Sequence, residues 1–295
     1  MAQTEGRLLQ GIGGFYYVET ADGIVECKAR GVFRKKGESP LAGDLVSITI
    51  SDDGKGMIES IAPRKNKLIR PPVANLDCLV MVSSVKDPEP NLPVLDKMIA
   101  IAEHKEIEPI LVFNKTDLAS ADALLRLYRS AGFSALAVSA ETGEGIEELR
   151  SLLSGKIAAF SGNSGVGKSS ILNQLDVRLG LETAEISTVL GRGKHTTRSS
   201  VLYRQDGGGY FVDTPGFSSL DMERLEWIHK DDLPYCFREF SPYLGACKFT
   251  SCRHLKEAGC AVLQALSEGK IAASRWETYK TMVEEAMTRA DWEIR

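Results

Sequence analysis

The sequence has no hydrophobic run long enough to cross a membrane, and its first ten residues lack the apolar core of a signal peptide. We therefore expect a cytoplasmic protein without a membrane partner. Cysteine is also scarce, since six cysteines in 295 residues do not make a disulfide framework. In a reducing compartment, cysteines that cluster are better explained as metal ligands than as bridges.

A large excess of basic charge is absent as well, because the formal net charge is −4. That balance argues against a general nucleic-acid binder. The first 70 residues differ, with 11 Lys and Arg against 9 Asp and Glu. Their basic side chains cluster at residues 30–36 and 64–70. Such clusters fit a solvated rim as well as a nucleic-acid face, so charge alone does not decide between them.

Short β-type runs separated by glycine-rich turns fill the first part of the sequence, without a helical period. The expected strands span residues 14–20, 24–30, 44–50 and 56–61. Five strands in about 65 residues would suit an OB-type barrel, and a β-module of another topology is the alternative. The stiff connection at 70–75 contains two prolines and is the best boundary, which gives a first domain at 1–70.

From residue 71 the pattern changes to buried apolar strands that alternate with helices. Strands are expected at 76–83, 108–113, 135–139 and 157–160, and helices at 92–104, 121–131, 145–153 and 168–175. This alternation predicts a doubly wound α/β sheet with parallel strands. Ligands of such sheets bind at the carboxyl ends of the strands, where the following motifs fall.

The segment Gly162–Ser169 has two glycines separated by four residues and followed by Lys and Ser, the phosphate-binding loop pattern. Its glycines let backbone N–H groups turn toward a triphosphate, while Lys168 places a charge on the β- and γ-phosphates and Ser169 can ligate Mg²⁺. A glycine-rich turn before a helix is the alternative. The expected phosphate contacts are Gly162, Asn163, Ser164, Gly165, Val166, Gly167, Lys168, Ser169 and Ser170, with Lys168 also expected to act in catalysis.

A second motif, Asn114-Lys115-Thr116-Asp117, follows the strand at 108–113 directly. The Asp117 carboxylate can accept from guanine N1–H and the exocyclic amine, which adenine cannot offer, so an ATP-using enzyme is disfavoured. We expect Asn114 to read the N7/O6 edge and the Lys115 stem to cover the ring. Alone, the motif would fit a strand-ending turn. Ser139 and Ala140, after the next strand, are expected to offer a backbone N–H to O6.

The segment Gly191–Arg198 is polar and interrupted by glycine, and Thr196 or Thr197 is expected to reach Mg²⁺ and the γ-phosphate. A hairpin at 201–204 and 209–212 then leads to Asp213, expected to hold Mg²⁺ through water, and to Gly216, whose N–H would sense the γ-phosphate. Phe217 stands where many GTPases place the Gln that orients the attacking water. His195 is the nearest polar candidate to replace that Gln, and unaided hydrolysis should be slow.

Past Gly216 the sequence contains Cys247-x₄-Cys252-x-His254-x₅-Cys260. Three thiolates and one imidazole can close a tetrahedral Zn²⁺ site, and the lack of an open position implies a structural role. Incidental buried cysteines are the alternative, and the remaining cysteines (Cys27, Cys78 and Cys236) are interpreted as core residues. Helices are expected at 261–266 and 272–290, with Trp276, Tyr279, Met282, Val283 and Met287 packing inward.

In the usual GTPase the phosphate loop precedes the base-reading Asn-Lys-x-Asp motif, whereas here it follows, so the sheet is circularly permuted. With these motifs the chain resembles, over nearly its whole length, the RsgA family of ribosome small-subunit-dependent GTPases, also known as YjeQ or YloQ. The resemblance implies an OB-fold at 1–70, a permuted GTPase domain at 71–220 and a zinc-binding helical domain at 221–295. It also implies a switch histidine that matters for activity, a role in late maturation of the small (30S) ribosomal subunit, and contact with 16S rRNA.

We therefore interpret the chain as a monomeric GTP hydrolase that binds GTP and GDP, uses Mg²⁺, holds one Zn²⁺ and is stimulated by the small subunit. Two alternatives come from other classes. A nucleotide-gated ribosome- or RNA-binding module would hydrolyse GTP only incidentally, which the missing Gln permits. An ATP-using P-loop enzyme would have to dispense with the guanine-reading motif.

Overall fold

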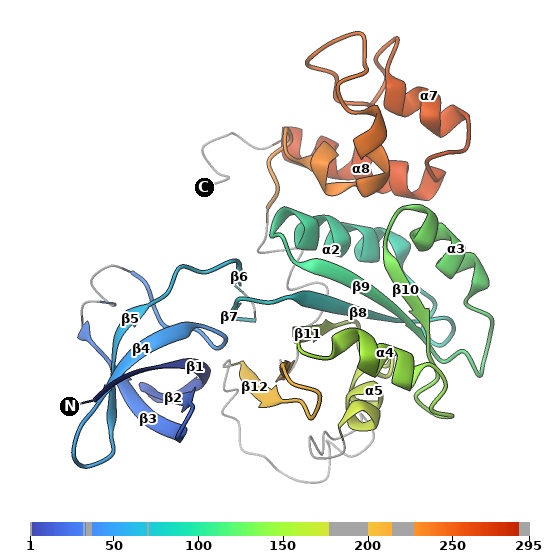
Figure 1. Cartoon of the computed structure of the whole chain (residues 1–295). Coiled ribbons are helices and arrows are strands. Elements are labelled where there is room, and N and C mark those ends of the chain that lie inside the picture. The colour runs from blue at the N-terminus through green and yellow to red at the C-terminus, as the bar shows by residue number, and fades with distance from the viewer. Residues whose placement is uncertain are drawn as a thin grey trace.

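The computed structural model describes residues 2–31, 33, 37–69, 71–176, 200–213 and 227–288. The elements are arranged as a β-barrel, a sheet flanked by helices, and a small helical region that packs on one of those helices (Figure 1). Within these residues, no helix combines the length and the apolar character needed to cross a membrane.

The barrel has five strands: β1 (Ala2–Ile12), β2 (Phe15–Thr20), β3 (Gly23–Ala29), β4 (Leu45–Ile50) and β5 (Gly56–Ile61). They form a closed barrel in the order β1-β2-β3-β5-β4, with β1 paired to β4. The β3–β5 pair is parallel and its neighbours are antiparallel. Alternate side chains fill the interior, where Leu8, Val18, Ile48 and Ile58 are fully buried. The expected OB-type barrel is confirmed.

The connection after the barrel is held by short-range pairing. β6 (Lys67–Leu68) and β7 (Val73–Ala74) form a small antiparallel ladder, and the Ala74 N–H donates to Ala42 O over 2.9 Å. Gly43 has a φ of 93°, and a Cβ there would lie 2.1 Å from Ala74 O. Only glycine therefore lets the chain pass this close to the barrel.

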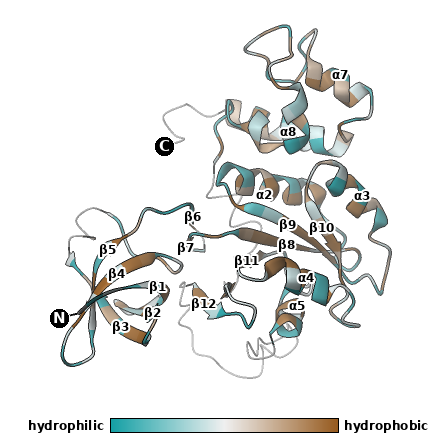
Figure 2. Cartoon of the chain, in the orientation of Figure 1, coloured by the Kyte–Doolittle hydropathy of each residue, from teal (hydrophilic) through white to brown (hydrophobic). Residues whose placement is uncertain are grey.

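The second sheet has the strand order β10-β9-β8-β11-β13-β12. Its strands are β8 (Cys78–Ser84), β9 (Glu108–Asn114), β10 (Ser134–Ala137), β11 (Ile157–Ser161), β12 (Val201–Arg204) and β13 (Tyr210–Asp213). All neighbours are parallel except the edge hairpin β12–β13. Strand β8, in the middle of the sheet, is strongly hydrophobic (Figure 2), as burial on both faces requires. The predicted parallel sheet and hairpin are confirmed.

Alternate residues of β8 face two different cores, which makes the sheet doubly wound. Leu79 and Met81 belong to the core that includes α2 (Leu92–His104) and α3 (Asp122–Ser130). Val80 and Val82 belong to the core that includes α4 (Ile146–Leu153) and α5 (Lys168–Leu175). The period of two along a strand places each set on its own face. All four helices agree with the sequence prediction to within one residue.

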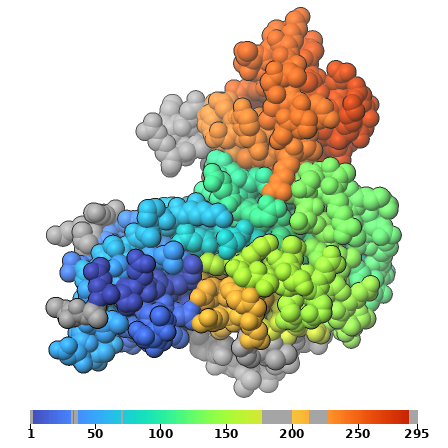
Figure 3. Space-filling view, viewed as in Figure 1, coloured from blue at the N-terminus to red at the C-terminus, as the bar shows by residue number. Residues whose placement is uncertain are grey.

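The C-terminal region contains η2 (Leu233–Cys236), η3 (Arg238–Tyr243), α7 (Ala261–Ser267) and α8 (Ala273–Met287). Figure 3 shows this region as an orange lobe on the side of the sheet that carries α2. Tyr279 and Val283 are fully buried, as predicted, and Trp276 and Met282 are partly buried. The prediction for Met287 is wrong, because this side chain is 53% exposed and Ala286 takes the inward position. The three cysteines interpreted as core residues are buried.

A buried charged cluster joins this region to α2. Arg275 is 0% exposed and pairs with Asp96 of α2 over 2.9 Å and with Glu239 of η3 over 2.6 Å. Asp96 also accepts from the Tyr128 and Thr278 hydroxyls, at 2.9 and 3.1 Å. The cluster therefore draws on four separate helical elements, and its charges are paired with each other instead of with water.

Candidate nucleotide site and metal centre

The candidate nucleotide site lies at the carboxyl edge of the parallel sheet. The segment Gly162–Ser169 follows β11 and enters α5, Asn114 ends β9, and Ser139 comes shortly after β10. β8 pairs with both β9 and β11, so two motifs that are separated in sequence meet at one edge. The structure thus brings the predicted phosphate loop and base-reading motif together.

Two glycines of the phosphate loop are required by the close approach of other groups. Gly162 has a φ of 156°, and a Cβ there would lie 2.4 Å from Val82 O. Gly167 has a φ of 90°, and its Cβ would lie 2.1 Å from the Asn114 side-chain nitrogen. The Lys168 Nζ donates to Gly162 O over 2.9 Å, so this charge already lies across the loop.

Asn114 joins three segments of the site. Its side chain is 2% exposed. The amide nitrogen donates to Val166 O in the phosphate loop over 2.8 Å, and Oδ1 accepts from the Ala140 N–H over 3.0 Å. The sequence did not predict this linking role, although an Asn at a strand end is a known turn former. It stays a prediction that Asn114 reads the N7/O6 edge of guanine. It also stays a prediction that the segment at Ala140 contacts the guanine O6.

Asp117, which carries the candidate base-reading carboxylate, is exposed, and a buried serine beneath it fixes its orientation. Asp117 Oδ1 accepts from the Ser139 hydroxyl over 2.6 Å, and Ser139 is fully buried. Ser139 Oγ in turn accepts from the Thr142 N–H over 3.2 Å. Ser139 thus holds one Asp117 oxygen, and the exposed Asp117 carboxylate can accept from a ligand with two adjacent donors.

Lys115, between these two residues, is also held in place. Its φ is 66°, an uncommon value for a residue with a side chain. Its Nζ donates to Asp87 O, in the segment that follows β8. The Lys115 stem therefore spans from the base-reading motif toward the phosphate loop, where Gly165 lies near Pro88.

Several predicted site residues lie outside the described residues: His195, Thr196, Thr197, Gly216 and Phe217. Asp213 is described only by its backbone, at the end of β13 and paired with Val201. β13 is the neighbour of β11 in the sheet, so its carboxyl end falls at the same edge as the phosphate loop. The predicted magnesium role of Asp213 stays a prediction.

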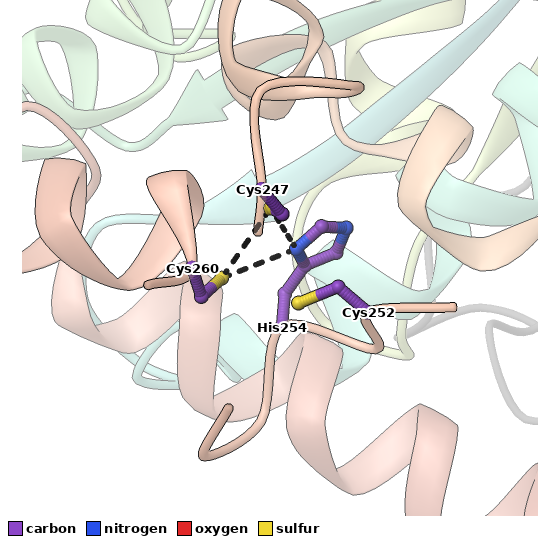
Figure 4. A group of neighbouring side chains, drawn as sticks. All are labelled: Cys247, Cys252, His254 and Cys260. Atoms are coloured by element: carbon purple, nitrogen blue, oxygen red, sulfur yellow. Dashed lines mark hydrogen bonds between the residues drawn. The ribbon is translucent and has the colours of Figure 1, made fainter. Parts of the chain in front are cut away.

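Four predicted zinc ligands form a compact cluster (Figure 4). The candidate ligand atoms of Cys247, Cys252, His254 and Cys260 all lie within 4.8 Å of one another. Cys247 Sγ is 3.8 Å from Cys260 Sγ, and His254 Nδ1 is 3.5 and 3.3 Å from these two sulfurs. A tetrahedral Zn²⁺ with ordinary bond lengths sets sulfur pairs about 3.8 Å apart and sulfur–nitrogen pairs about 3.6 Å apart. The residues therefore fit zinc.

Hydrogen bonds around the cluster fix its loop. Glu257 accepts from the backbone N–H groups of Arg253, Leu255 and Lys256 at 2.8–3.0 Å. Although burial acts in the opposite direction, these bonds lower the pKa of Glu257 to about 2. Burial raises the pKa of the Cys252 thiol to about 12 and lowers the pKa of His254. Burial thus favours neutral side chains, and a bound cation is the partner that would favour a thiolate.

The fold and the nucleotide site define a P-loop GTPase whose base-reading motif precedes its phosphate loop, a circular permutation of the usual order. The model of the RsgA GTPase family matches residues 61–223, and that of the RsgA N-terminal domain matches residues 5–58. Together the two cover most of the barrel and the sheet.

Relatives that match nearly the whole chain point to the same family. A small ribosomal subunit biogenesis GTPase RsgA from Caldanaerobacter subterraneus subsp. tengcongensis is 46% identical over 288 residues, covering 97% of this chain and 96% of its own. The crystal structure of YjeQ from Thermotoga maritima has a TM-score of 0.83 and 36% identity, covering 98% of this chain and all of its own. YloQ, described as a circularly permuted GTPase, has a TM-score of 0.81 at 31% identity, covering 98% and 96%. The chain belongs to the RsgA GTPase family.

Proposed function

We propose that this protein hydrolyses GTP during biogenesis of the small ribosomal subunit and that the subunit stimulates its turnover. The observation that carries the nucleotide part is the Asn114 side chain, which ties the phosphate loop at Val166 to the base-reading segment at Ala140. The relatives named above are small ribosomal subunit biogenesis GTPases, which supports the cellular role.

The nucleotide chemistry assigns each group a task. The backbone of Gly162–Ser170 and the Lys168 ammonium hold the phosphates, and Asp117 selects guanine by accepting from its N1–H and amine. Pre-orientation of Asp117 by Ser139 lowers the ordering cost of binding, since one carboxylate oxygen is already fixed. Mg²⁺, which neutralises charge on the β- and γ-phosphates when bound, would be held by Ser169, by Asp213 and by Thr196 or Thr197. Gly216 would sense the γ-phosphate, and His195 is our candidate to position the attacking water.

Zinc has a structural role in this proposal. Cys247, Cys252, His254 and Cys260 use all four tetrahedral positions, so the ion would fix the loop between η3 and α7 and leave no open position for chemistry. We assign the OB-type domain to 1–70, the permuted GTPase domain to 71–220 and the zinc domain to 221–295. The protein is proposed to act as a cytoplasmic monomer.

The barrel offers a surface suited to 16S rRNA. A cleft of about 300 Å³ is lined by residues of β2, β3, β4, β5 and the β4–β5 turn, including Phe15, Glu26, Lys28 and Lys55. Phe15 is 37% exposed, and the Lys28 Nζ lies 5.2 Å from the centre of its ring. A partly exposed aromatic ring beside an ammonium group suits stacking of a base with a phosphate nearby. We therefore propose this cleft as the RNA contact of the barrel.

Nucleotide competition and co-sedimentation test the proposal. GTP and GDP should displace a fluorescent guanine nucleotide, and ATP at the same concentration should not. Protein loaded with a non-hydrolysable GTP analogue should sediment with purified small ribosomal subunits, and Phe15→Ala should weaken that binding without changing guanine affinity. Equal displacement by ATP would support an ATP-using enzyme instead, and absence from the subunit fraction would refute the ribosomal role.

A further inference from the structure

Two cross-strand pairs meet where the barrel contacts the β12–β13 hairpin. Arg7 of β1 lies opposite Glu19 of β2, and Arg204 of β12 lies opposite Tyr210 of β13. Glu19 accepts from Arg204 over 3.1 Å and from the Tyr210 hydroxyl. The Arg7 guanidinium lies 5.6 Å from the centre of the Tyr210 ring. We call these four residues the junction.

The two barrel residues of the junction are held in place by the barrel itself. Arg7 is anchored by a 2.9 Å hydrogen bond to Gly43 O, and the Glu19 side chain is only 18% exposed. Burial is the largest cause that raises the pKa of Tyr210, and the neighbouring Glu19 carboxylate raises it further. The Tyr210 hydroxyl therefore remains a proton donor to Glu19 at neutral pH. Figure 3 shows the gold hairpin packed against the blue barrel, and β1 contacts β12.

The opposite end of the same hairpin connects to the nucleotide side. Val201 pairs with Asp213 at that end, three residues along each strand from the Arg204–Tyr210 pair. A rise of about 3.3 Å per residue puts the two ends about 10 Å apart. The segment with Thr196 and Thr197 enters the hairpin there, and the segment with Gly216 leaves it. The hairpin is thus the element shared by both predicted γ-phosphate sensors.

Strand β2 brings the barrel's exposed cleft close to the junction. Phe15, at the start of β2, lines that cleft, and Glu19 lies four residues further along the strand. Near Phe15, Ser200 contributes to a second cleft of about 200 Å³ between the barrel loop and β12. Ser200 is 3% exposed, and its hydroxyl has no hydrogen-bond partner in the part of the chain that the structure describes. The barrel and the residue that precedes β12 therefore line a common cleft, in addition to the contacts of the junction.

We propose that Glu19 is a positioning residue that couples the occupant of the barrel to the nucleotide state through the β12–β13 hairpin. This inference rests on the proposed function, because it takes the small subunit as the barrel's partner. A subunit seated on β2 holds the junction, and the junction holds the hairpin from which both sensors extend. By linkage, GTP then tightens subunit binding by the same factor by which the subunit tightens GTP binding.

The test is the ratio of two dissociation constants for purified small subunits, measured with GDP and with a non-hydrolysable GTP analogue. Coupling between two sites is typically about 5–150-fold, so the wild-type ratio should lie in that range. Glu19→Gln removes the charge pairing to Arg204, and Tyr210→Phe removes the hydroxyl. Each should lower the ratio about fivefold or more, and the double variant should lower it no further than the stronger single variant. GDP affinity, basal turnover and the unfolding midpoint should stay near wild-type values.

Glu5→Gln is the matched control, because Glu5 is an exposed carboxylate on the same face of β1 as Arg7. It should leave the ratio unchanged. A wild-type ratio retained by Glu19→Gln and Tyr210→Phe would overturn the inference, and so would a wild-type ratio near 1. Wild-type protein that fails to bind subunits at all would instead refute the proposed function, on which the inference rests.

Discussion

Replacing Arg275 with Met should destabilise the C-terminal region severely. The guanidinium is fully buried between Asp96 and Glu239, whose side chains are 1% and 5% exposed. Burial opposes the charge, but the two carboxylates raise the pKa of Arg275, so it stays protonated. Burial also raises the pKa of Asp96, whereas the charge of Arg275 acts to lower it. Removing the one cation leaves two carboxylates without their partner.

Breaking a buried ion pair from one side costs about 3–5 kcal/mol, and we expect Arg275→Met to fall in that range. Part of the loss comes from the Phe237 and Phe133 rings, whose centres lie 4.7 and 5.3 Å from the guanidinium carbon. Met fills similar space among these rings but carries no charge. The expected loss is therefore mostly the cost of the uncompensated carboxylates.

Tryptophan fluorescence during urea unfolding measures this loss, because all three Trp residues lie after residue 226. The signal reports the C-terminal region, while binding of a fluorescent GDP reports the GTPase domain. Arg126→Met, at an exposed position of α3, is the control and should change the free energy of unfolding by less than about 0.5 kcal/mol. Adding Asp96→Asn to Arg275→Met should cost less than the sum of the single effects. A loss below about 1 kcal/mol for Arg275→Met would refute this reasoning.

Other predictions concern the nucleotide and the metal. Asp117→Asn should weaken GTP by about 2–3 kcal/mol and favour xanthosine triphosphate, because the C2 oxygen of xanthine accepts where the guanine amine donates; unchanged GTP affinity would remove Asp117 from the base site. Ser139→Ala should weaken GTP and GDP equally, by about 1 kcal/mol, since it frees the Asp117 carboxylate. Lys168→Ala should abolish GTP turnover without shifting the unfolding midpoint, and normal turnover would contradict the phosphate-loop assignment. Metal analysis should find one Zn²⁺ per chain, and Cys252→Ser should unfold the Trp-containing region while GDP still binds; a metal-free protein with a native tail would refute the zinc site.

The sequence predicted the elements whose hydrophobic pattern is regular. The helix expected at 92–104 is α2 with the same bounds, because Asn91 caps it and a proline stands in its first turn. Strand β1, by contrast, was not predicted. Its glycines weaken the strand pattern, but a Cβ at Gly6 would lie 2.5 Å from Glu19 O, so the close approach of β2 requires glycine there.

For the site, the sequence predicted separate local motifs but not the hydrogen bonds and ion pairs that connect distant parts of the chain. Spacing predicted roles for Lys168, Asp117 and the four candidate zinc ligands, since each motif is local in sequence. The Asn114 links and the Arg275 cluster connect residues from distant parts of the chain, so only the tertiary fold brings them together. The inward position given to Met287 failed because Ala286 holds the buried position in the last turn of α8. The face of α8 that meets α2 carries Arg275 and Thr278, which both contact Asp96.

GTP turnover with and without purified small ribosomal subunits, at saturating GTP, tests the central claim most directly. Phe217 cannot orient water, so the protein alone should turn over slowly, and the subunit should raise the rate at least tenfold, or about 1.4 kcal/mol of activation free energy. Lys168→Ala should show no such increase. A rate that is the same with and without subunits would contradict the account, and GTP-dependent subunit binding without turnover would instead identify a nucleotide-gated binding module.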